Sequence, residues 1–155
     1  MTSKLDDELL ADENIYYGPI TFGISTKENE DNGEELAALR AEIIANPLIV
    51  YFQTGDSSLN LDAAQRLKMQ KISTYVDKAD DGKVSVVGHT DSVGSKVKNT
   101  QLGLERAETV KGYLVQNGIN ISKIDVSSQG PRKPIATNKT KAGRAKNRRV
   151  EVTLK

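Results

Sequence analysis

Short apolar runs alternate with helical patterns along the later part of the chain and predict a small sheet. Four stretches have the length and composition of strands, at 48–52, 84–87, 124–127 and 150–154. The last stretch alternates apolar with polar residues, which is typical of a half-buried strand. Gly88 and Gly130, which follow the second and third stretches, mark where those strands are expected to end.

Apolar residues at helical spacing predict two long helices between the first three strands. The first helix is expected to begin after a cap at Asn60 and to end at Asp80-Asp81-Gly82. The second is expected to end at Asn117-Gly118, and a short helix is expected near residues 141–146. The order of strands and helices is β-α-β-α-β-β. This order predicts an α+β fold, in which right-handed crossovers build a small mixed sheet with helices packed on it.

The first 46 residues differ from the rest in composition and are expected to form an acidic N-terminal segment. They carry 11 acidic and 3 basic side chains. Alternating apolar residues over 20–24 predict a short strand, and residues 28–35 are expected to form a solvated loop. A short amphipathic helix is expected to follow and to stop at Asn46-Pro47. The predicted boundary separates residues 1–46 from a domain at 47–155.

Charge is distributed unevenly, although the net charge of the chain is only +1. Residues 1–80 carry 7 basic and 15 acidic side chains, whereas residues 81–155 carry 15 basic and 6 acidic ones. The basic half suits a polyanionic partner, which is either nucleic acid or an anionic wall polymer. Pairing between the two halves of the same chain is the simpler interpretation.

The chain has no cysteine and a single histidine, His89. This composition excludes disulfides, thiolate metal sites, cysteine nucleophiles and metal sites with several histidines. We therefore expect no metal ion and no cofactor. His89 has no partner nucleophile at a spacing that favours catalysis, so a hydrogen bond within its loop is the expected role.

Three polar side chains near the second strand and the second helix are placed so that they can face one another. Asp91 follows the strand, and Asn99 and Arg106 lie two turns apart on one face if the helix has begun by Asn99. This trio suits a zwitterion, because an ammonium pairs with Asp91 and a carboxylate fits the planar fork of Arg106. The spacing alone also allows a plain ion pair between Asp91 and Arg106, with no ligand.

These residues belong to an ordered set of motifs that continues almost to the end of the chain. The set comprises Gly88-His89-Thr90-Asp91, Asn99, Leu102-Gly103, Arg106-Ala107, Val110, Tyr113-Leu114, Gly130, Pro134-Ile135-Ala136-Thr137-Asn138, Thr140 and residues 143–150. Over residues 47–155 the chain closely resembles the OmpA-like C-terminal domain of OmpA, MotB and Pal-type proteins. That domain is a periplasmic module that binds peptidoglycan.

The resemblance assigns roles to the polar residues of these loops. It implies that Asp91 binds the ammonium, and Arg106 the carboxylate, of diaminopimelate in the peptide stem of peptidoglycan. Six further residues complete the expected ligand-binding set: Gln53, Thr54, Gly55, Thr90, Asn99 and Arg148. Gln53 departs from the family pattern, which often has Asp after the Phe. A neutral side chain there forms hydrogen bonds but adds no charge.

The function implied by the resemblance is non-catalytic binding that tethers an outer-membrane or membrane-anchored protein to the cell wall. The expected location is the periplasm, with a membrane contact only through an anchor outside this chain, since no apolar leader follows Met1. A stator-type motor protein would use the same module.

Two other classes of function remain as alternatives. One is a basic nucleic-acid-binding domain, although aromatic residues make up only 5% of the chain, which leaves few platforms for base stacking. The other is a hydrolase acting on wall peptides, which the lack of cysteine and of a metal-binding cluster disfavours. Nucleic acid is therefore not an expected partner.

Overall fold

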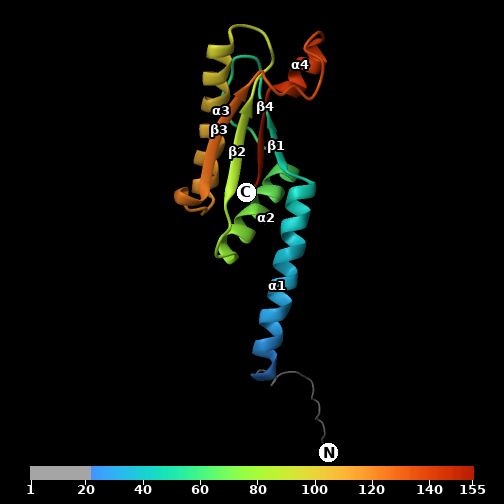
Figure 1. Ribbon diagram of the computed structural model, residues 1–155, viewed down its shortest axis with the longest axis vertical. Helices are drawn as coiled ribbons and strands as arrows, with labels where there is room; N and C mark the ends of the chain where they lie inside the picture. Colours follow the sequence, from blue (N-terminus) through green and yellow to red (C-terminus); the bar gives the residue numbers. More distant parts are fainter. Residues whose placement is uncertain (1–21) are drawn as a thin grey trace, which may run out of the picture. The chain divides into compact units, whose positions relative to one another are not determined.

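The computed structural model describes residues 22–155, with side chains described from Gly33 onward. Its helices and strands follow the chain in this order: α1 (Phe22–Ala45), β1 (Leu48–Tyr51), α2 (Ala63–Lys78), β2 (Val84–His89), α3 (Lys96–Gln116), the 3₁₀ turn η1 (Ile121–Lys123), β3 (Ile124–Gly130), α4 (Lys141–Asn147) and β4 (Arg149–Leu154) (Figure 1). From β1 onward, this is the predicted β-α-β-α-β-β order.

The four strands form one mixed sheet in the order β1-β4-β2-β3. β2 and β3 are parallel, as expected for strands joined through a helix, and β4 is antiparallel to both β1 and β2. The last strand therefore lies inside the sheet, between β1 and β2. β2 and β3 extend to His89 and Gly130, slightly beyond their predicted ends. The predicted α+β fold is confirmed.

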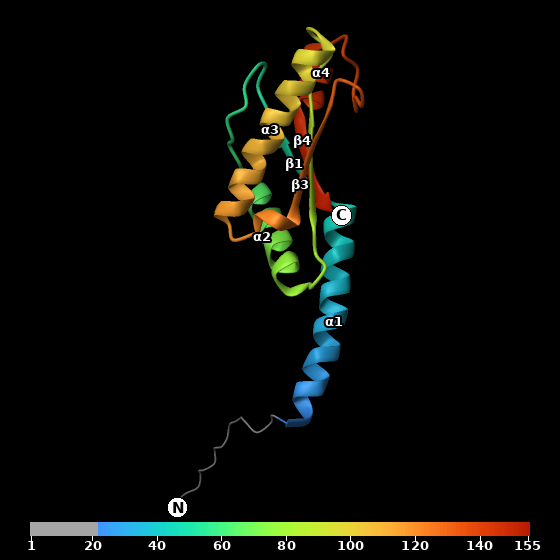
Figure 2. The same cartoon turned by 60° about the vertical axis from the view of Figure 1, so that its left-hand side comes forward.

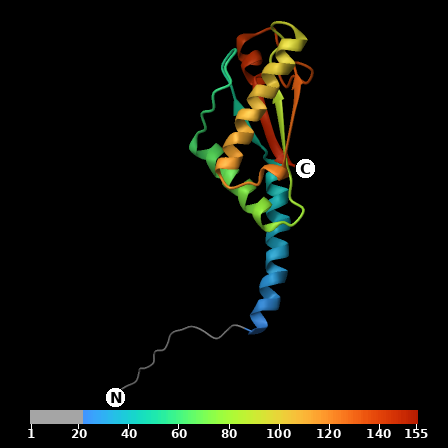
Figure 3. The ribbon, with the colours of Figure 1, turned by 90° about the vertical axis from the view of Figure 1, so that its left-hand side faces the viewer.

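α2 and α3 cover the same face of the sheet (Figure 3). The strand residues that point toward these helices are fully buried, among them Val84 and Val86 of β2 and Val150 and Val152 of β4. Their neighbours Val87 and Thr153 are only half-buried. This alternation gives the sheet one closed face and one more open face, because successive side chains of a strand point to opposite sides.

A pair of glycines lets α3 approach the end of β2. A Cβ atom on Gly88 would lie 1.8 Å from the carbonyl oxygen of Gly103, and one on Gly103 would lie 2.3 Å from the hydroxyl of Ser128. No other residue type fits at position 88, since the Gly103 carbonyl belongs to the backbone and a Cβ needs at least about 3 Å from such an atom. The close approach brings the middle of α3 up to the loop that follows β2.

Local hydrogen bonds set the start of both long helices. α2 begins after Asp62, whose side chain accepts from the Gln65 amide at 2.8 Å, while the Gln65 side chain accepts from the Asp62 amide at 2.9 Å. This reciprocal capping box displaces the cap predicted at Asn60. α3 begins after Ser95, which caps the Lys98 amide at 3.1 Å. The helix has therefore begun by Asn99, which is the condition for Asn99 and Arg106 to lie on one face.

The N-terminal part of the described chain differs from the prediction. Phe22–Ala45 form one helix, so residues 22–24 are helical rather than extended, and the loop predicted at 28–35 is helical as well. Ile20, the first residue of the predicted strand, lies outside the described residues. Three alternating apolar positions also fit the spacing of a helix, and the Glu and Ala residues that follow favour one. The helix stop at Asn46-Pro47 is confirmed.

The chain divides into two units between Ala37 and Ala38. The second unit includes the last turns of α1, where Ile43 is buried. A functional boundary between residues 46 and 47 remains a prediction. None of the helices within residues 22–155 combines the length and the apolar character needed to cross a membrane.

Candidate functional site

The loops that follow β1 and β2, the first turns of α3 and the residue before β4 enclose a pocket of about 240 Å³. The segment between β1 and α2 runs alongside α3, so that residues far apart in the sequence become neighbours here (Figure 2). The pocket is lined by Thr54, Gly55, Thr90, Asp91, Val93, Gly94, Ser95, Lys98, Asn99, Leu102, Arg106 and Arg148. Seven of the eight residues predicted for the site are among them.

Arg106 lines the pocket and is almost completely buried, at 1% exposed. Its guanidinium donates to three backbone carbonyls, Nε to Asp56 at 2.9 Å, Nη2 to Gln53 at 3.0 Å and Nη1 to His89 at 3.3 Å. These bonds use three of the five N–H donors that a guanidinium carries. Among the described residues, no carboxylate lies within ion-pair distance of Arg106.

The surroundings of Arg106 favour an anion. Burial first, and then the charge of Arg148, lower the pKa of Arg106 to about 10 against the opposing effects of Asp91 and Asp56. Arg106 is therefore charged at neutral pH. The Phe52 ring supports the guanidinium, with its centroid 5.3 Å from Cζ in cation–π contact. A buried cation with unused donors and no carboxylate partner is well suited to bind a carboxylate.

Asp91 is paired with a different arginine. Its Oδ2 accepts from Nη1 of Arg148 at 3.1 Å, and its Oδ1 accepts from the Val93 amide at 3.0 Å. Arg148 is held in turn by the Phe52 carbonyl, to which its Nε donates at 2.9 Å. Two fixed donors thus orient the Asp91 carboxylate in the pocket wall. The direct Asp91–Arg106 ion pair, the alternative that the spacing allowed, is not formed.

Asn99 and Thr90 shape the loop that carries Asp91. Nδ2 of Asn99 donates to the Val93 carbonyl at 3.0 Å, and Oγ1 of Thr90 donates to the Asp91 carbonyl at 2.9 Å. The Thr90 amide donates to the Gly130 carbonyl at 2.9 Å. These bonds tie the loop to α3 and to the end of β3, so Asn99 and Thr90 position the pocket wall.

Gln53 is the one predicted site residue whose side chain does not line this pocket. Its side chain is exposed and borders a separate shallow pocket beside Tyr51 and Lys146. Its backbone carbonyl, however, accepts from Nη2 of Arg106. The contribution of Gln53 to the site is therefore made by its main chain.

Several residues that shape the site were not singled out from the sequence. Lys98, Val93 and Leu102 line the pocket. Asn147 is fully buried, and its Oδ1 accepts from the amides of Ile135 and Ala136 at 2.8 and 3.0 Å. Asn147 thereby orders the segment before α4. In the sequence, only its position within the motif at residues 143–150 indicated that Asn147 has a structural role.

Arg148, the residue before β4, and Arg149, the first residue of β4, have different partners. Arg148 faces the pocket, while Arg149 is buried and bonds Glu151 at 2.7 Å through Nε and the Lys133 carbonyl at 3.1 Å through Nη2. One arginine therefore serves the pocket, and the other joins β4 to the segment before α4.

The role predicted for the His89 side chain is wrong. Both ring nitrogens are buried without a hydrogen-bond partner, and the nearest carboxylate oxygen, on Glu151, lies 3.9 Å from Nε2. Burial, and then the charge of Arg149, lower the pKa of His89 to about 4 against the opposing effect of Glu151. The bond that His89 does make uses its backbone carbonyl, which accepts from Arg106.

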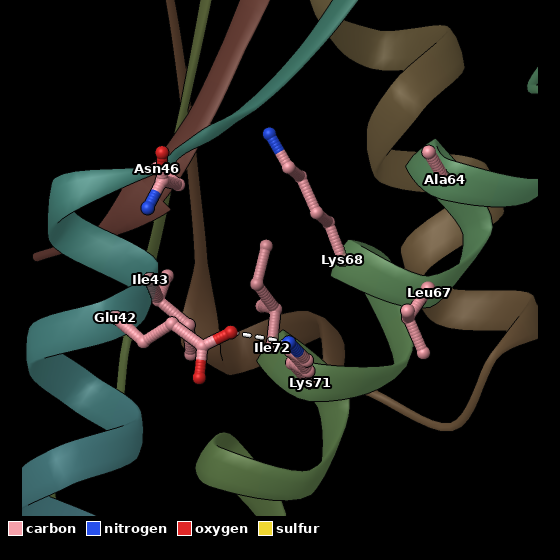
Figure 4. A pocket seen from close by; sticks show the side chains of 8 residues that line it. All are labelled: Glu42, Ile43, Asn46, Ala64, Leu67, Lys68, Lys71 and Ile72. Atoms are coloured by element: carbon pink, nitrogen blue, oxygen red, sulfur yellow. Dashed lines mark hydrogen bonds and ion pairs between the residues drawn. The ribbon is translucent and has the colours of Figure 1, made fainter.

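A further pocket lies between the last turns of α1 and the first half of α2 (Figure 4). It shares no lining residue with the pocket around Asp91 and Arg106. Ile43 and Ile72 contribute apolar side chains to it, and Lys71 forms an ion pair with Glu42 at its edge. Lys68 extends toward the Pro47 carbonyl, at 3.4 Å from Nζ. This pocket contains none of the residues predicted for ligand binding.

Comparison with known proteins identifies the family. The model of the OmpA family matches residues 51–148, which is more than half of the chain. The chain belongs to the OmpA family. The expected resemblance is thereby confirmed over residues 51–148.

The names of two relatives refer to the outer membrane and to peptidoglycan. Outer membrane protein A of Bordetella avium is 36% identical over 121 residues, covering 78% of this chain and 61% of its own length. The peptidoglycan-binding protein ArfA of Mycobacterium tuberculosis is 35% identical over 100 residues, covering 64% of this chain and 31% of its own length. The chain thus spans less than two thirds of either relative.

The fold is also found in a solved structure. The peptidoglycan-associated lipoprotein of Burkholderia pseudomallei superimposes with a TM-score of 0.63 at 27% identity. The match covers 69% of this chain and 89% of that one. The OmpA-like fold predicted from the motifs is therefore confirmed by structure as well as by sequence.

Proposed function

We propose that this domain binds the peptide stem of peptidoglycan without catalysis and so tethers the protein that carries it to the cell wall. Relatives named for peptidoglycan binding and association support the polymer as the partner. A relative named as an outer membrane protein supports a location in the periplasm, at the outer membrane and the wall. A stator-type wall anchor would use the same binding step.

The ligand group proposed for the pocket is the free amino-acid end of diaminopimelate. The observation that carries this proposal is Arg106, a buried cation that lines the pocket and has no carboxylate partner among the described residues. A ligand carboxylate supplies that partner through the remaining N–H donors. The ligand ammonium pairs with Asp91, whose carboxylate is already oriented by Arg148 and the Val93 amide.

A volume of about 240 Å³ suits the end of one amino-acid side chain rather than a whole peptide. The rest of the stem would then lie across the mouth of the pocket. Thr54 and Gly55 border the pocket from the loop after β1, and Val93 and Leu102 add apolar wall that suits the methylene groups of the ligand. Polar lining residues therefore bind the charged groups of the ligand, and apolar lining residues contact its methylene groups.

Co-sedimentation with purified sacculi tests the proposal. The variant Arg106→Lys keeps a positive charge but loses the fork that binds both carboxylate oxygens, so binding should fall at least tenfold. Arg66→Lys is the matched control, because Arg66 lies on exposed α2 surface outside the pocket. Circular dichroism establishes that both variants are folded. Undiminished binding by folded Arg106→Lys would refute the assignment, and binding to DNA rather than sacculi would favour the nucleic-acid alternative.

A further inference from the structure

Lys98 stands at the mouth of the same pocket and has no role in the site described so far. It lies in the first turn of α3, lines the pocket together with Asp91 and Arg106, and is exposed. In the described part of the chain, no carboxylate lies within ion-pair distance of its ammonium. The N-terminal end of α3 adds its own positive potential at this place.

The charges of the ionisable side chains that line the pocket do not sum to zero. One acidic residue, Asp91, and three basic residues line it: Lys98, Arg106 and Arg148. Asp91 and Arg148 neutralise each other in their 3.1 Å ion pair. A zwitterionic amino-acid end brings one positive and one negative charge and leaves the total unchanged. The complementary ligand therefore carries at least one further negative charge close to that end.

We infer that Lys98 binds a second carboxylate of the peptide stem, the α-carboxylate of the γ-linked glutamate that precedes diaminopimelate. This inference rests on the proposed function. Arg106 is buried at the bottom of the pocket, whereas Lys98 is exposed at its rim. The two cations thus meet different parts of one ligand. The diaminopimelate end enters the pocket, and the preceding residue remains at the mouth, within reach of a flexible lysine.

Titration of the full chain with two tripeptides tests this assignment. One is L-Ala-γ-D-Glu-meso-diaminopimelate, and the other is identical except that the glutamate α-carboxylate is a carboxamide. The unmodified chain should bind the acid about three- to fivefold more tightly than the amide, the range of an exposed ion pair. This preference should shrink as the salt concentration rises.

Variants of two lysines in the same helical turn separate a specific contact from overall charge. Lys98→Met should bind both tripeptides equally and keep its affinity for the amide. Lys96→Met removes the same charge from the same turn, but Lys96 does not line the pocket, so the preference should persist. A preference that survives in Lys98→Met, or equal binding of acid and amide by the unmodified chain, overturns the role of Lys98. Failure of the unmodified chain to bind either tripeptide overturns the proposed function along with it.

Discussion

The carboxylate of Asp91 is paired with Arg148, at 3.1 Å, and not with Arg106. This choice of partner decides the electrostatics of the pocket. It fixes the negative group in the wall, where an ammonium can approach it, and leaves Arg106 charged without a carboxylate beside it. Three backbone carbonyls and the face of the Phe52 ring hold the Arg106 guanidinium in place. The pocket therefore presents both charges that the proposed zwitterionic ligand requires.

Replacement of Asp91 should remove the ammonium contact and leave the fold intact. Asp91→Asn preserves the size of the side chain and an oxygen for the Val93 amide, but it removes the charged partner of both the ligand ammonium and Arg148. Loss of one partner of a buried charge pair costs about 2–5 kcal/mol, so affinity for a diaminopimelate tripeptide should fall by about thirtyfold or more.

Calorimetric titration measures this loss, with Asp125→Asn as the control. Asp125 lies on β3 outside the pocket, and its exposed carboxylate pairs with Lys155. The control should bind like the unmodified chain. Equal affinities for Asp91→Asn and Asp125→Asn would show that Asp91 does not contact the ligand.

Acid should destabilise the domain through His89. In the folded chain burial lowers the pKa of His89 from 6.5 to about 4, so the unfolded chain takes up the proton first. Stability therefore falls as the pH falls from about 6.5 to about 4, by on the order of 2 kcal/mol. Asp56, whose pKa is lowered by its hydrogen bonds with Ser58, loses its contribution only at lower pH, below its ordinary value of 3.8.

Urea unfolding at pH 7 and pH 5 measures this effect. His89→Gln removes the titrating group, so its free energy of unfolding should change much less between the two pH values. An equal change in both proteins would assign the acid sensitivity to other groups.

The contact between Gly88 and Gly103 should tolerate no added methyl group. Gly103→Ala places a Cβ 2.3 Å from the Ser128 hydroxyl and 3.2 Å from the backbone carbonyl oxygen of Gly88, which cannot rotate away. The variant should therefore lower the melting temperature, because overpacking costs about 1–3 kcal/mol. Gly112→Ala is the control in the same helix, since nothing lies within 4 Å of its Cβ position. That substitution should stabilise α3 by up to about 1 kcal/mol. Thermal unfolding would refute the packing argument if both variants shifted in the same direction.

The N-terminal segment should be dispensable for binding, while its last turns contribute to stability. A chain that begins at residue 46 lacks the buried Ile43 and the Glu42 partner of Lys71. Burial of such an apolar side chain contributes about 1.5–3 kcal/mol, so the melting temperature should fall by several degrees. A chain that begins at residue 38 keeps both groups. Both truncations should bind the tripeptide like the full chain, and a tenfold loss in a folded truncation would place part of the site in the removed segment.

Much of the fold could be predicted because it follows from periodicity, whereas most of the candidate site was expected only from the resemblance to the OmpA family. Alternation and apolar runs located the strands, and helical spacing put Asn99 and Arg106 on one face of α3. The choice of Arg148 as the partner of Asp91 could not be predicted from spacing, since β4 and the loop after β2 meet only in the folded sheet.

Other features could not be predicted from the sequence, and each has a physical reason. Three backbone carbonyls hold Arg106, and a carbonyl is present at every residue, so composition does not indicate which ones turn inward. Lys98 and Lys96 have the same chemistry, and only the start of α3 decides which of them reaches the pocket. The helix over residues 22–35 was missed because a short apolar alternation fits either period.

The most direct test of the central claim is a calorimetric comparison of two stem peptides that differ only in their third residue. Lysine at this position keeps the side-chain ammonium but lacks the second carboxylate of diaminopimelate, so Asp91 remains satisfied and Arg106 faces no anion. Loss of that bidentate contact should weaken binding by on the order of a hundredfold. Position 53 carries a neutral Gln in place of the Asp that the family often has, so no added carboxylate repels the ligand carboxylate and this discrimination should persist. Tight binding of the diaminopimelate peptide with a large loss for the lysine peptide is the predicted result. Equal affinity for the two peptides would show that Arg106 does not bind a ligand carboxylate.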